Sequence, residues 1–271
     1  MNPTSYRLVN VATGRVFDDT GWLMGDPEGG SPSLVRAVYA NRKFTPRDDL
    51  DGIYRYADWM PIRRTLRRSC APVTYPSKGL ARYLGLENLY ITFSGWNPRI
   101  GARMRTCSFK ETEAYSVLAR MDAAEKRILV VQSAGNTARA FAQVCSDNHI
   151  PIVICVPEDN LHDLWFRREL HPCVKLIAAP RGCDYYDAIA LGEKLATDPR
   201  FMLEGGAKNV AKSRTQLSIY SATTSRHAHL IGVGDLVIRI FRSSSGADLC
   251  WLFVNLFSLH IIQKFVRHKH K

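Results

Sequence analysis

Residues 128–157, ILVVQSAGNTARAFAQVCSDNHIPIVICVP, decide the fold class of this chain. The run ILVV is continuously apolar and predicts a buried strand. Residues 137–148 (TARAFAQVCSDN) predict a helix, because their small and apolar positions recur on one side. The run PIVICVP is again fully apolar, as expected for a strand that is covered on both faces.

The same alternation continues on both sides of this stretch. Between residues 111 and 121, apolar positions recur at the i, i+3, i+4, i+7 spacing of an amphipathic helix. Downstream, the sequence predicts a helix around 160–170, a strand at 174–180, and a further helix after Asp184, whose side chain suits an N-cap. Repeated alternation of helix and strand indicates an α/β fold with a parallel sheet covered by helices.

The beginning of the chain follows a different pattern. In YRLVNVATGRVFDD, β-branched and aromatic residues flank a turn at Gly14, which predicts a hairpin of two short strands. Residues 24–33 (MGDPEGGSPS) have the composition of a loop.

Composition sets further limits on the class of protein. The 271 residues are 46% apolar, enough for a substantial core, which excludes a disordered chain. Half of the net charge of +12 falls in residues 213–271, which hold eight Lys or Arg and two Asp. The one dense basic run before that, RRTLRR at 63–68, is explained by a solvated face or by the rim of an anionic-substrate site. Nucleic acid is therefore not the expected partner.

Cysteine usage and hydropathy bear on the compartment. The seven cysteines include no C-x-x-C pair, and the chain does not open with a secretory signal, so reduced thiols in a cytoplasmic protein are expected. The longest apolar run, residues 249–262, is 14 long and contains three polar residues, short of a span of about 20. No membrane partner is predicted.

The loop QSAGNT marks a candidate ligand site. In parallel sheets the ligand lies at the carboxyl ends of the strands, where loops lead into helices. Ser133, Gly135 and Asn136 follow the strand ILVV and precede a helix start, so backbone N–H groups and the helix dipole would hold an anion such as a carboxylate. Lys110, 23 residues before Ser133, begins the preceding helix and would open onto the same crevice.

Lys110 itself allows two interpretations. Apolar neighbours such as Cys107 and Phe109 would lower its pKa and free the amine to form a Schiff base with an aldehyde. The alternative is an ordinary lysine at a helix start that extends its ammonium to solvent.

The order of these motifs resembles one enzyme superfamily. SFK at a helix start, an apolar strand, SAGNT at a helix start and then IPIVICVP resemble the pyridoxal-phosphate enzymes of tryptophan synthase β-like fold, or fold type II. Within it the chain looks like the threonine-synthase branch and, more closely, the cysteate synthases, over about residues 5–212. The longer resembling stretches are AVYANRKFTPRDDLDGIYRYADWMPIRR, PVTYPSKGLARYLGLENLYITFSGWNP, TCSFKETEA, SAGNTARAFAQV, DYYDAIALGEKLA and FMLEGGAKNVAK.

The resemblance implies a cofactor and a set of site residues. Lys110 would bind pyridoxal 5'-phosphate as a Schiff base and move protons at Cα and Cβ of the substrate. Asn136 would hydrogen-bond the phenolic oxygen of the cofactor, and Ser133, Gly135 and Thr137 would bind the amino-acid carboxylate. No structural zinc is expected, because the first strands lack the cysteines that some relatives carry there.

The reaction implied is a β-replacement that belongs to coenzyme M biosynthesis. L-phosphoserine and sulfite would give L-cysteate and phosphate, so the partners are a small anionic amino acid and sulfite, and a homo-oligomer is left open. Basic residues near the site would suit two such anions. The candidates are Arg103, Arg105 and Arg139, against which stands ordinary surface placement for each.

The resemblance ends at Lys212, which affects both the domain plan and the activity. The glycine-rich G-S-G-T-G-G loop for the cofactor phosphate is absent from the sequence, so weak cofactor binding and a truncated or frame-shifted end are expected. The expected parts are an N-terminal hairpin and extension (1–60), the first part of a large domain (61–105), a small α/β domain with the lysine and asparagine loop (106–198), a return toward the large domain (199–212) and an atypical tail (213–271).

Two other functions stay open at this point. The first is a threonine synthase or another pyridoxal-phosphate enzyme that replaces or eliminates a β-substituent. The second is a non-catalytic remnant or basic binding module whose tail contacts nucleic acid or membrane.

Overall fold

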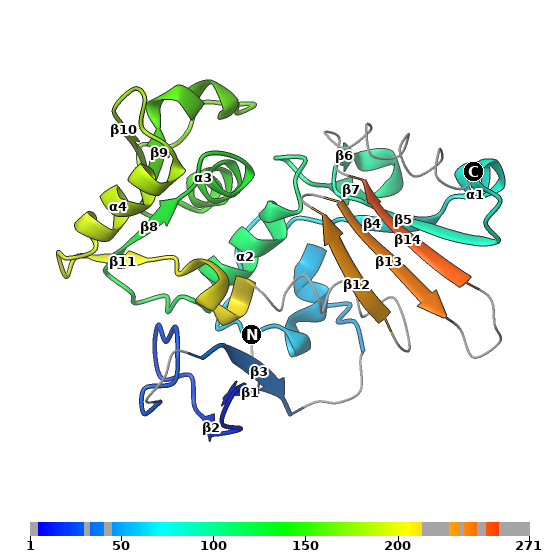
Figure 1. The fold of residues 1–271 in the computed structure, drawn as a ribbon, viewed down its shortest axis with the longest axis horizontal. Helices are drawn as coiled ribbons and strands as arrows, with labels where there is room; N and C mark the ends of the chain where they lie inside the picture. Colours follow the sequence, from blue (N-terminus) through cyan, green and yellow to red (C-terminus); the bar gives the residue numbers. More distant parts are fainter. Residues whose placement is uncertain are drawn as a thin grey trace. The chain divides into compact units, whose positions relative to one another are not determined.

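The protein is described here by a computed structural model, which covers residues 5–29, 33–40, 45–212, 228–233, 236–242 and 248–254. The chain forms two compact units (Figure 1). Unit 1 consists of Met1–Cys70 and Lys110–Ala222, and unit 2 consists of Ala71–Phe109 and Thr223–Lys271. Lys110 and the whole SAGNT loop therefore belong to unit 1.

The centre of unit 1 is a four-stranded parallel sheet in the order β10-β9-β8-β11. Its strands are β8 (Ile128–Gln132), β9 (Ile152–Pro157), β10 (Val174–Ala179) and β11 (Phe201–Leu203). The three longer strands confirm the predictions from ILVV, PIVICVP and residues 174–180. The parallel pairing confirms the predicted α/β class.

Three α-helices belong to the described part of unit 1 around this sheet. They are α2 (Lys110–Arg120), α3 (Asn136–Asn148) and α4 (Tyr185–Leu195). Helix α4 packs on all four strands, whereas α3 packs on β8, β9 and β10 and also against α2. All three helices were predicted from the sequence.

Both faces of the central strands are buried. Val130 of β8 and Val153 of β9 form a core cluster to which Leu191 of α4 contributes. The alternate positions Val131 and Ile154, which point to the opposite face, are also fully buried. Burial on both faces explains why these strands are continuously apolar instead of alternating.

The N-cap residue Asp184 fixes the start of α4, and Gly192 fixes its approach to the sheet. The Asp184 side chain accepts from the backbone N–H groups of Tyr186 (2.7 Å) and Asp187 (3.2 Å), and Asp187 accepts from the Asp184 N–H in return. This capping box confirms Asp184 as the N-cap. Gly192 lies so close to Gln132 of β8 that an added Cβ would come within 2.5 Å of its side chain.

The prediction of a helix around residues 160–170 was wrong. The chain forms a 3₁₀-helix at Glu158–Asp163 and then continues without helix. Leu164 is the only residue of the segment 160–170 that is buried, so a helix there would have no apolar face to pack. The Trp165 carbonyl instead accepts a hydrogen bond from Arg139.

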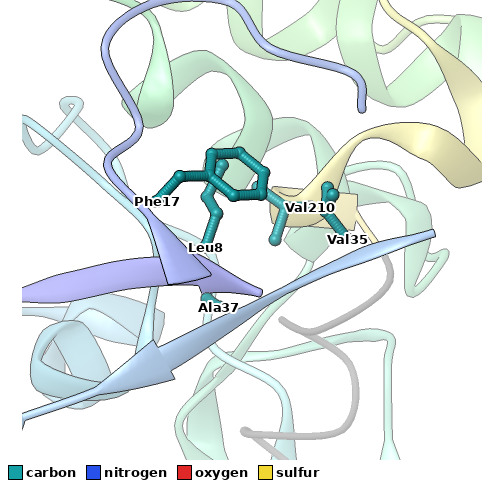
Figure 2. Packing of buried hydrophobic residues seen from close by; sticks show 5 residues of the cluster. All are labelled: Leu8, Phe17, Val35, Ala37 and Val210. Atoms are coloured by element: carbon teal, nitrogen blue, oxygen red, sulfur yellow. The ribbon is translucent and has the colours of Figure 1, made fainter. Parts of the chain in front are cut away.

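The N-terminal part of unit 1 forms a separate antiparallel sheet in the order β2-β1-β3. Its strands are β1 (Tyr6–Asn10), β2 (Val16–Phe17) and β3 (Val35–Tyr39). β1 and β2 confirm the predicted hairpin, and Gly14 in its turn has a positive φ of 75°. Five side chains form its core, as Figure 2 shows, namely Leu8, Phe17, Val35, Ala37 and Val210. A further 3₁₀-helix, Gly52–Trp59, follows β3.

Unit 2 contains a mixed sheet in the order β12-β13-β14-β5-β4. Its strands are β4 (Val73–Pro76), β5 (Asn88–Phe93), β12 (Ala228–Val233), β13 (Leu236–Arg242) and β14 (Asp248–Val254). β14 pairs with β5 in parallel, and the other pairs are antiparallel. Three segments of the region expected to be a tail therefore form strands.

Shorter elements complete unit 2 and the end of unit 1. They are α1 (Lys78–Leu84), β6 (Trp96–Asn97), a 3₁₀-helix at Pro98–Ile100, β7 (Ala102–Arg103) and a 3₁₀-helix at Gly206–Lys208. Residues 249–254 of the long apolar run lie in β14, while 255–262 fall outside the described residues. Among the helices that the structure describes, none has the length and apolarity to cross a bilayer.

Candidate active site

Lys110 is the first residue of α2, and its amine forms an ion pair with the carboxylate of Glu113. Lys110 Nζ lies 2.8 Å from Oε1 of Glu113, one helical turn further on. The lysine side chain is 25% exposed and that of Glu113 is 3% exposed, so the amine reaches solvent and the carboxylate does not. The sequence had suggested apolar neighbours for this amine. In the structure the amine is paired with the Glu113 carboxylate.

Glu113 connects Lys110 to a second buried charge pair. Its Oε2 lies 3.8 Å from Nζ of Lys212, and the same Nζ lies 3.3 Å from Oε2 of Glu204. Burial raises the pKa of the Glu204 carboxyl above its ordinary value, although the Lys212 ammonium acts in the opposite direction. Charges therefore alternate along the series Lys110, Glu113, Lys212 and Glu204, which we call the charge series.

The Ser133–Gly135 loop connects the carboxyl end of β8 to the first turn of α3. The Ser133 N–H donates to the Cys155 carbonyl (3.1 Å), which ties the loop to β9. Ser133 Oγ accepts from the Gly135 N–H (3.3 Å). Gly135 is the N-cap of α3, and a Cβ there would meet nothing within 4 Å. The space above this glycine is open.

Asn136 is the first residue of α3 and accepts a hydrogen bond from a buried arginine. Arg139 Nη1 donates to Asn136 Oδ1 at 3.0 Å, and Arg139 Nε donates to the Trp165 carbonyl at 3.2 Å. The guanidinium carbon lies 3.6 Å from the centre of the Trp165 ring. Arg139 is only 3% exposed, so the expectation of ordinary surface placement was wrong for this residue. The contacts to Asn136 and Trp165 hold it inside.

The other two arginine candidates lie in unit 2. Arg103 is exposed and Arg105 is partly exposed. Thr137, the second residue of α3, is half-buried. Within unit 1, the structure thus connects Ser133 to Gly135 by a hydrogen bond, and connects Asn136 to Arg139.

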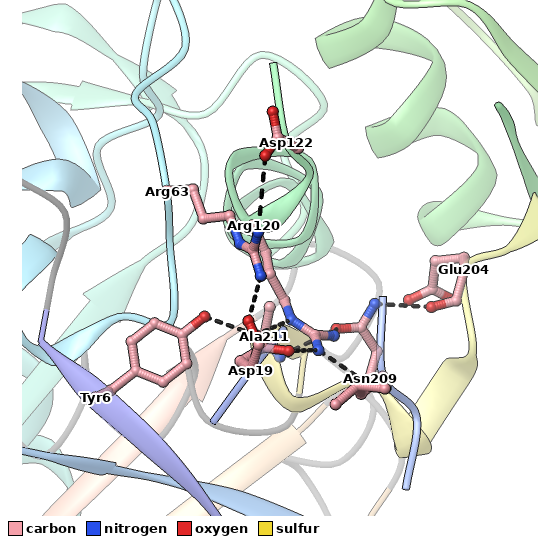
Figure 3. A network of polar contacts seen from close by, with 9 residues as sticks. Tyr6, Asp19, Arg63, Arg120, Asp122, Glu204, Asn209 and Ala211 are labelled. Carbon is pink, nitrogen blue, oxygen red and sulfur yellow. Dashed lines mark hydrogen bonds and ion pairs between the residues drawn. The ribbon is translucent and has the colours of Figure 1, made fainter. Parts of the chain in front are cut away.

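A second polar cluster, which the sequence did not predict, fixes the far end of α2 (Figure 3). Arg120 is fully buried and donates from Nε and Nη2 to both carboxylate oxygens of Asp19, at 2.9 and 2.7 Å. Its Nη1 donates to Asn209 Oδ1 at 3.2 Å. The Tyr6 hydroxyl donates to Asp19 at 2.6 Å, and burial raises the pKa of that phenol. Asp19 and Arg120 are 101 residues apart, so no short motif could reveal the pair.

The structure gives no indication of a metal centre among the residues that it describes. Within those residues, no group of three or more His, Cys, Asp or Glu side chains is arranged to hold a metal ion. The six cysteines with described side chains are free thiols.

Known proteins resemble this chain mainly at the level of sequence. It is 48% identical over 180 residues to a cysteate synthase of Methanocella paludicola, in a match that covers 66% of this chain and 42% of that protein. It is 44% identical over 213 residues to a cysteate synthase of Methanoculleus marisnigri, covering 76% of this chain and 47% of that protein. The chain is similar in sequence to these cysteate synthases.

A third cysteate synthase, from Methanospirillum hungatei, is 41% identical over 209 residues, which is 77% of this chain and 48% of that protein. The chain thus spans less than half of the length of these cysteate synthases. No family model matches it.

Solved structures resemble the chain more weakly. O-ureido-L-serine synthase matches with a TM-score of 0.35 and 16% identity, over 49% of this chain and 40% of the other. Threonine deaminase isoform 2 of Solanum lycopersicum matches with a TM-score of 0.40 and 17% identity, over 57% and 40%. The α/β assignment accordingly rests on the strand order of unit 1 and not on these matches.

Proposed function

We propose that this chain binds pyridoxal 5'-phosphate and converts L-phosphoserine and sulfite into L-cysteate and phosphate. The observation that carries the proposal is the combination in unit 1 of a lysine that opens α2 and an asparagine loop that opens α3. The sequence identity of 41–48% to proteins named cysteate synthase supports the choice of reaction.

Topology supports a common location for the lysine and the loop. α3 begins at the carboxyl end of β8, and α2 precedes the amino end of that strand. α3 connects the parallel strands β8 and β9, so its N-terminus lies at the carboxyl edge of the sheet. We propose that the N-terminus of α2, which packs against α3, lies near the same edge. That edge is where ligands bind in parallel sheets.

The residues present fit the aldehyde and ring of the cofactor. Lys110 offers a partly exposed amine, Asn136 offers an amide, and the space at Gly135 is open to an approaching group.

The chemistry is divided between cofactor and protein. When bound, pyridoxal 5'-phosphate acts as an electron sink for negative charge at Cα of an amino acid. Lys110 would take the proton from Cα, and would return it after phosphate has left Cβ and sulfite has added there. Ser133, Gly135 and Thr137 would hold the carboxylate at the start of α3, because the N-terminus of an α-helix favours an anion. The Asn136 amide would donate to the phenolic oxygen of the ring.

The test is formation of L-cysteate by the full chain supplied with pyridoxal 5'-phosphate, L-phosphoserine and sulfite, measured by liquid chromatography and mass spectrometry. Lys110→Ala should lower the rate by a factor of about 10²–10⁴, the usual contribution of a positioned acid–base group. Lys126→Ala, which removes an exposed lysine, is the matched control and should leave the rate unchanged.

Two results would count against this function. Threonine formed from phosphohomoserine, with no cysteate from phosphoserine, would assign the chain to the threonine synthase reaction. Equal rates in the parent and Lys110→Ala would remove the lysine from the mechanism.

A further inference from the structure

We propose that Arg139 is the positioning residue for Asn136. Arg139 would hold the Asn136 amide in one orientation, so that its NH₂ group and not its oxygen is presented to the phenolic oxygen of the cofactor ring. The inference rests on the proposed function, because it assigns the chemistry that Asn136 requires there.

The contact between the two side chains fixes the orientation of the amide. Arg139 Nη1 lies 3.0 Å from the terminal amide atom of Asn136. A guanidinium has five donors and no acceptor, so the atom that faces it must be the amide oxygen. A flipped amide would set its own N–H donors against the N–H donors of Arg139. With Oδ1 occupied, Nδ2 is left as the donor.

Arg139 is itself held on several sides, as a positioning residue must be. Its Nε donates to the Trp165 carbonyl (3.2 Å), and its guanidinium lies over the Trp165 ring. Its backbone N–H donates to the Gly135 carbonyl (3.1 Å), within the first turn of α3. With 3% of its surface exposed, the side chain has little freedom to release Asn136.

Helix stability alone does not account for a buried cation at this place. The N-terminus of an α-helix carries partial positive charge, so acidic side chains are favoured in its first turn and basic ones are disfavoured. α3 has no acidic residue in its first turn and places Arg139 at the fourth position. Because the helix dipole opposes the Arg139 guanidinium, its burial there is better explained by its hydrogen bond to the Asn136 amide.

A donor at this position is what the cofactor chemistry demands. The phenolic oxygen of pyridoxal 5'-phosphate is an acceptor when ionised, and an amide oxygen placed against it would repel it. Asn136 can satisfy it only through Nδ2. By binding Oδ1 of Asn136, Arg139 would leave Nδ2 to face the phenolic oxygen of the cofactor ring.

The test is a double-mutant cycle read as cofactor affinity of the full chain. Pyridoxal 5'-phosphate is titrated into the parent, Arg139→Met, Asn136→Ala and the double variant, and the dissociation constant and visible absorption of the bound cofactor are recorded. Arg139→Met should weaken binding about tenfold in the parent, the value of one directed hydrogen bond. In the Asn136→Ala background it should add no further loss, because no amide remains to be oriented.

The results separate the inference from the proposed function. An equal loss from Arg139→Met in both backgrounds, or no loss in the parent, would overturn the positioning role while leaving the cofactor site intact. A parent that binds no cofactor would overturn the proposed function, and the inference with it. Should Arg139→Met fail to fold, Arg139→Lys serves, with a smaller loss expected in the parent and none beside Asn136→Ala.

Discussion

At the scale of single residues, the charge series explains how a lysine whose side chain is mostly buried is kept at the start of α2. Lys110 and Lys212 both lie next to the buried carboxylate of Glu113, at 2.8 and 3.8 Å. Burying one charge without a partner costs several kcal/mol, so the alternation of sign is what makes the cluster tolerable. For Glu204, at the end of this series, burial disfavours the charged form of the carboxyl group.

Glu204 supplies a prediction on the pH dependence of stability. Its pKa is raised in the folded protein, so folding favours the protonated form, and the charge destabilises the native state as pH rises above the ordinary carboxyl range. Glu204→Gln should therefore raise the melting temperature at pH 7 to 8. At a pH below the ordinary carboxyl pKa, the two proteins should melt together. Thermal unfolding followed by circular dichroism across pH measures this.

Glu125→Gln is the control, because it should give the opposite sign. The Arg127 guanidinium lowers the pKa of Glu125 to about 2. Its charge therefore stabilises the folded state at neutral pH, and this contribution is lost as pH falls through about 2. A Glu204→Gln variant that is less stable than the parent at pH 8 would show that the charge of Glu204 is compensated in the native state.

Some of these contacts could be predicted from sequence and others could not. The contacts from Lys110 to Glu113 and from Asn136 to Arg139 both follow from helical spacing of three residues. The pairing of Lys212 with Glu113 joins residues that are far apart in the chain, and no local pattern indicates it. The catalytic and binding roles of the site residues stay predictions.

At the scale of elements, the spacing of apolar residues was sufficient to predict a helix or strand wherever those apolar residues pack into the core. β8 and β9 are apolar because both faces are covered, and α4 carries its own N-terminal signal in Asp184. The segment 160–170 misled because its apolar residues, such as Trp165, serve a different contact. Periodicity describes a face but does not identify what packs against it.

The ion pair between Arg120 of α2 and Asp19 of the N-terminal part of unit 1 gives a prediction at the scale of elements. Asp19→Asn would leave the fully buried Arg120 without its carboxylate partner, and breaking such a pair typically costs about 3–5 kcal/mol. The free energy of unfolding, measured by urea titration with Trp22 fluorescence as one probe, should fall by that amount. Trp22 suits this purpose because its ring lies 5.2 Å from the Arg120 guanidinium.

Asp122→Asn provides the comparison for this experiment. Asp122 lies 3.8 Å from Arg63, and its side chain is 60% exposed. Exposed pairs of this kind contribute about 0–1 kcal/mol, so the variant should unfold close to the parent. Equal effects of the two substitutions would mean that the Arg120 pair does not anchor α2.

At the scale of the whole molecule, both units are assembled from distant parts of the chain. In unit 2, β14 pairs with β5 across more than 150 residues, in parallel, which no sequence pattern predicted. Non-local pairing of this kind depends on tertiary contacts and not on local propensity. The five-part domain plan and the truncated or frame-shifted end stay predictions. The matches cover less than half of the cysteate synthases, and the lysine and the asparagine loop of the proposed site both lie in unit 1.

The most direct test of the account is to find where pyridoxal 5'-phosphate attaches. The full chain is incubated with the cofactor, reduced with borohydride, digested and mapped by mass spectrometry. The account predicts one dominant pyridoxyl label, on Lys110, that disappears in Lys110→Ala and survives in Lys126→Ala. A label spread over exposed lysines, or one that persists in Lys110→Ala of a folded protein, would contradict the assignment of Lys110 as the residue that binds the cofactor.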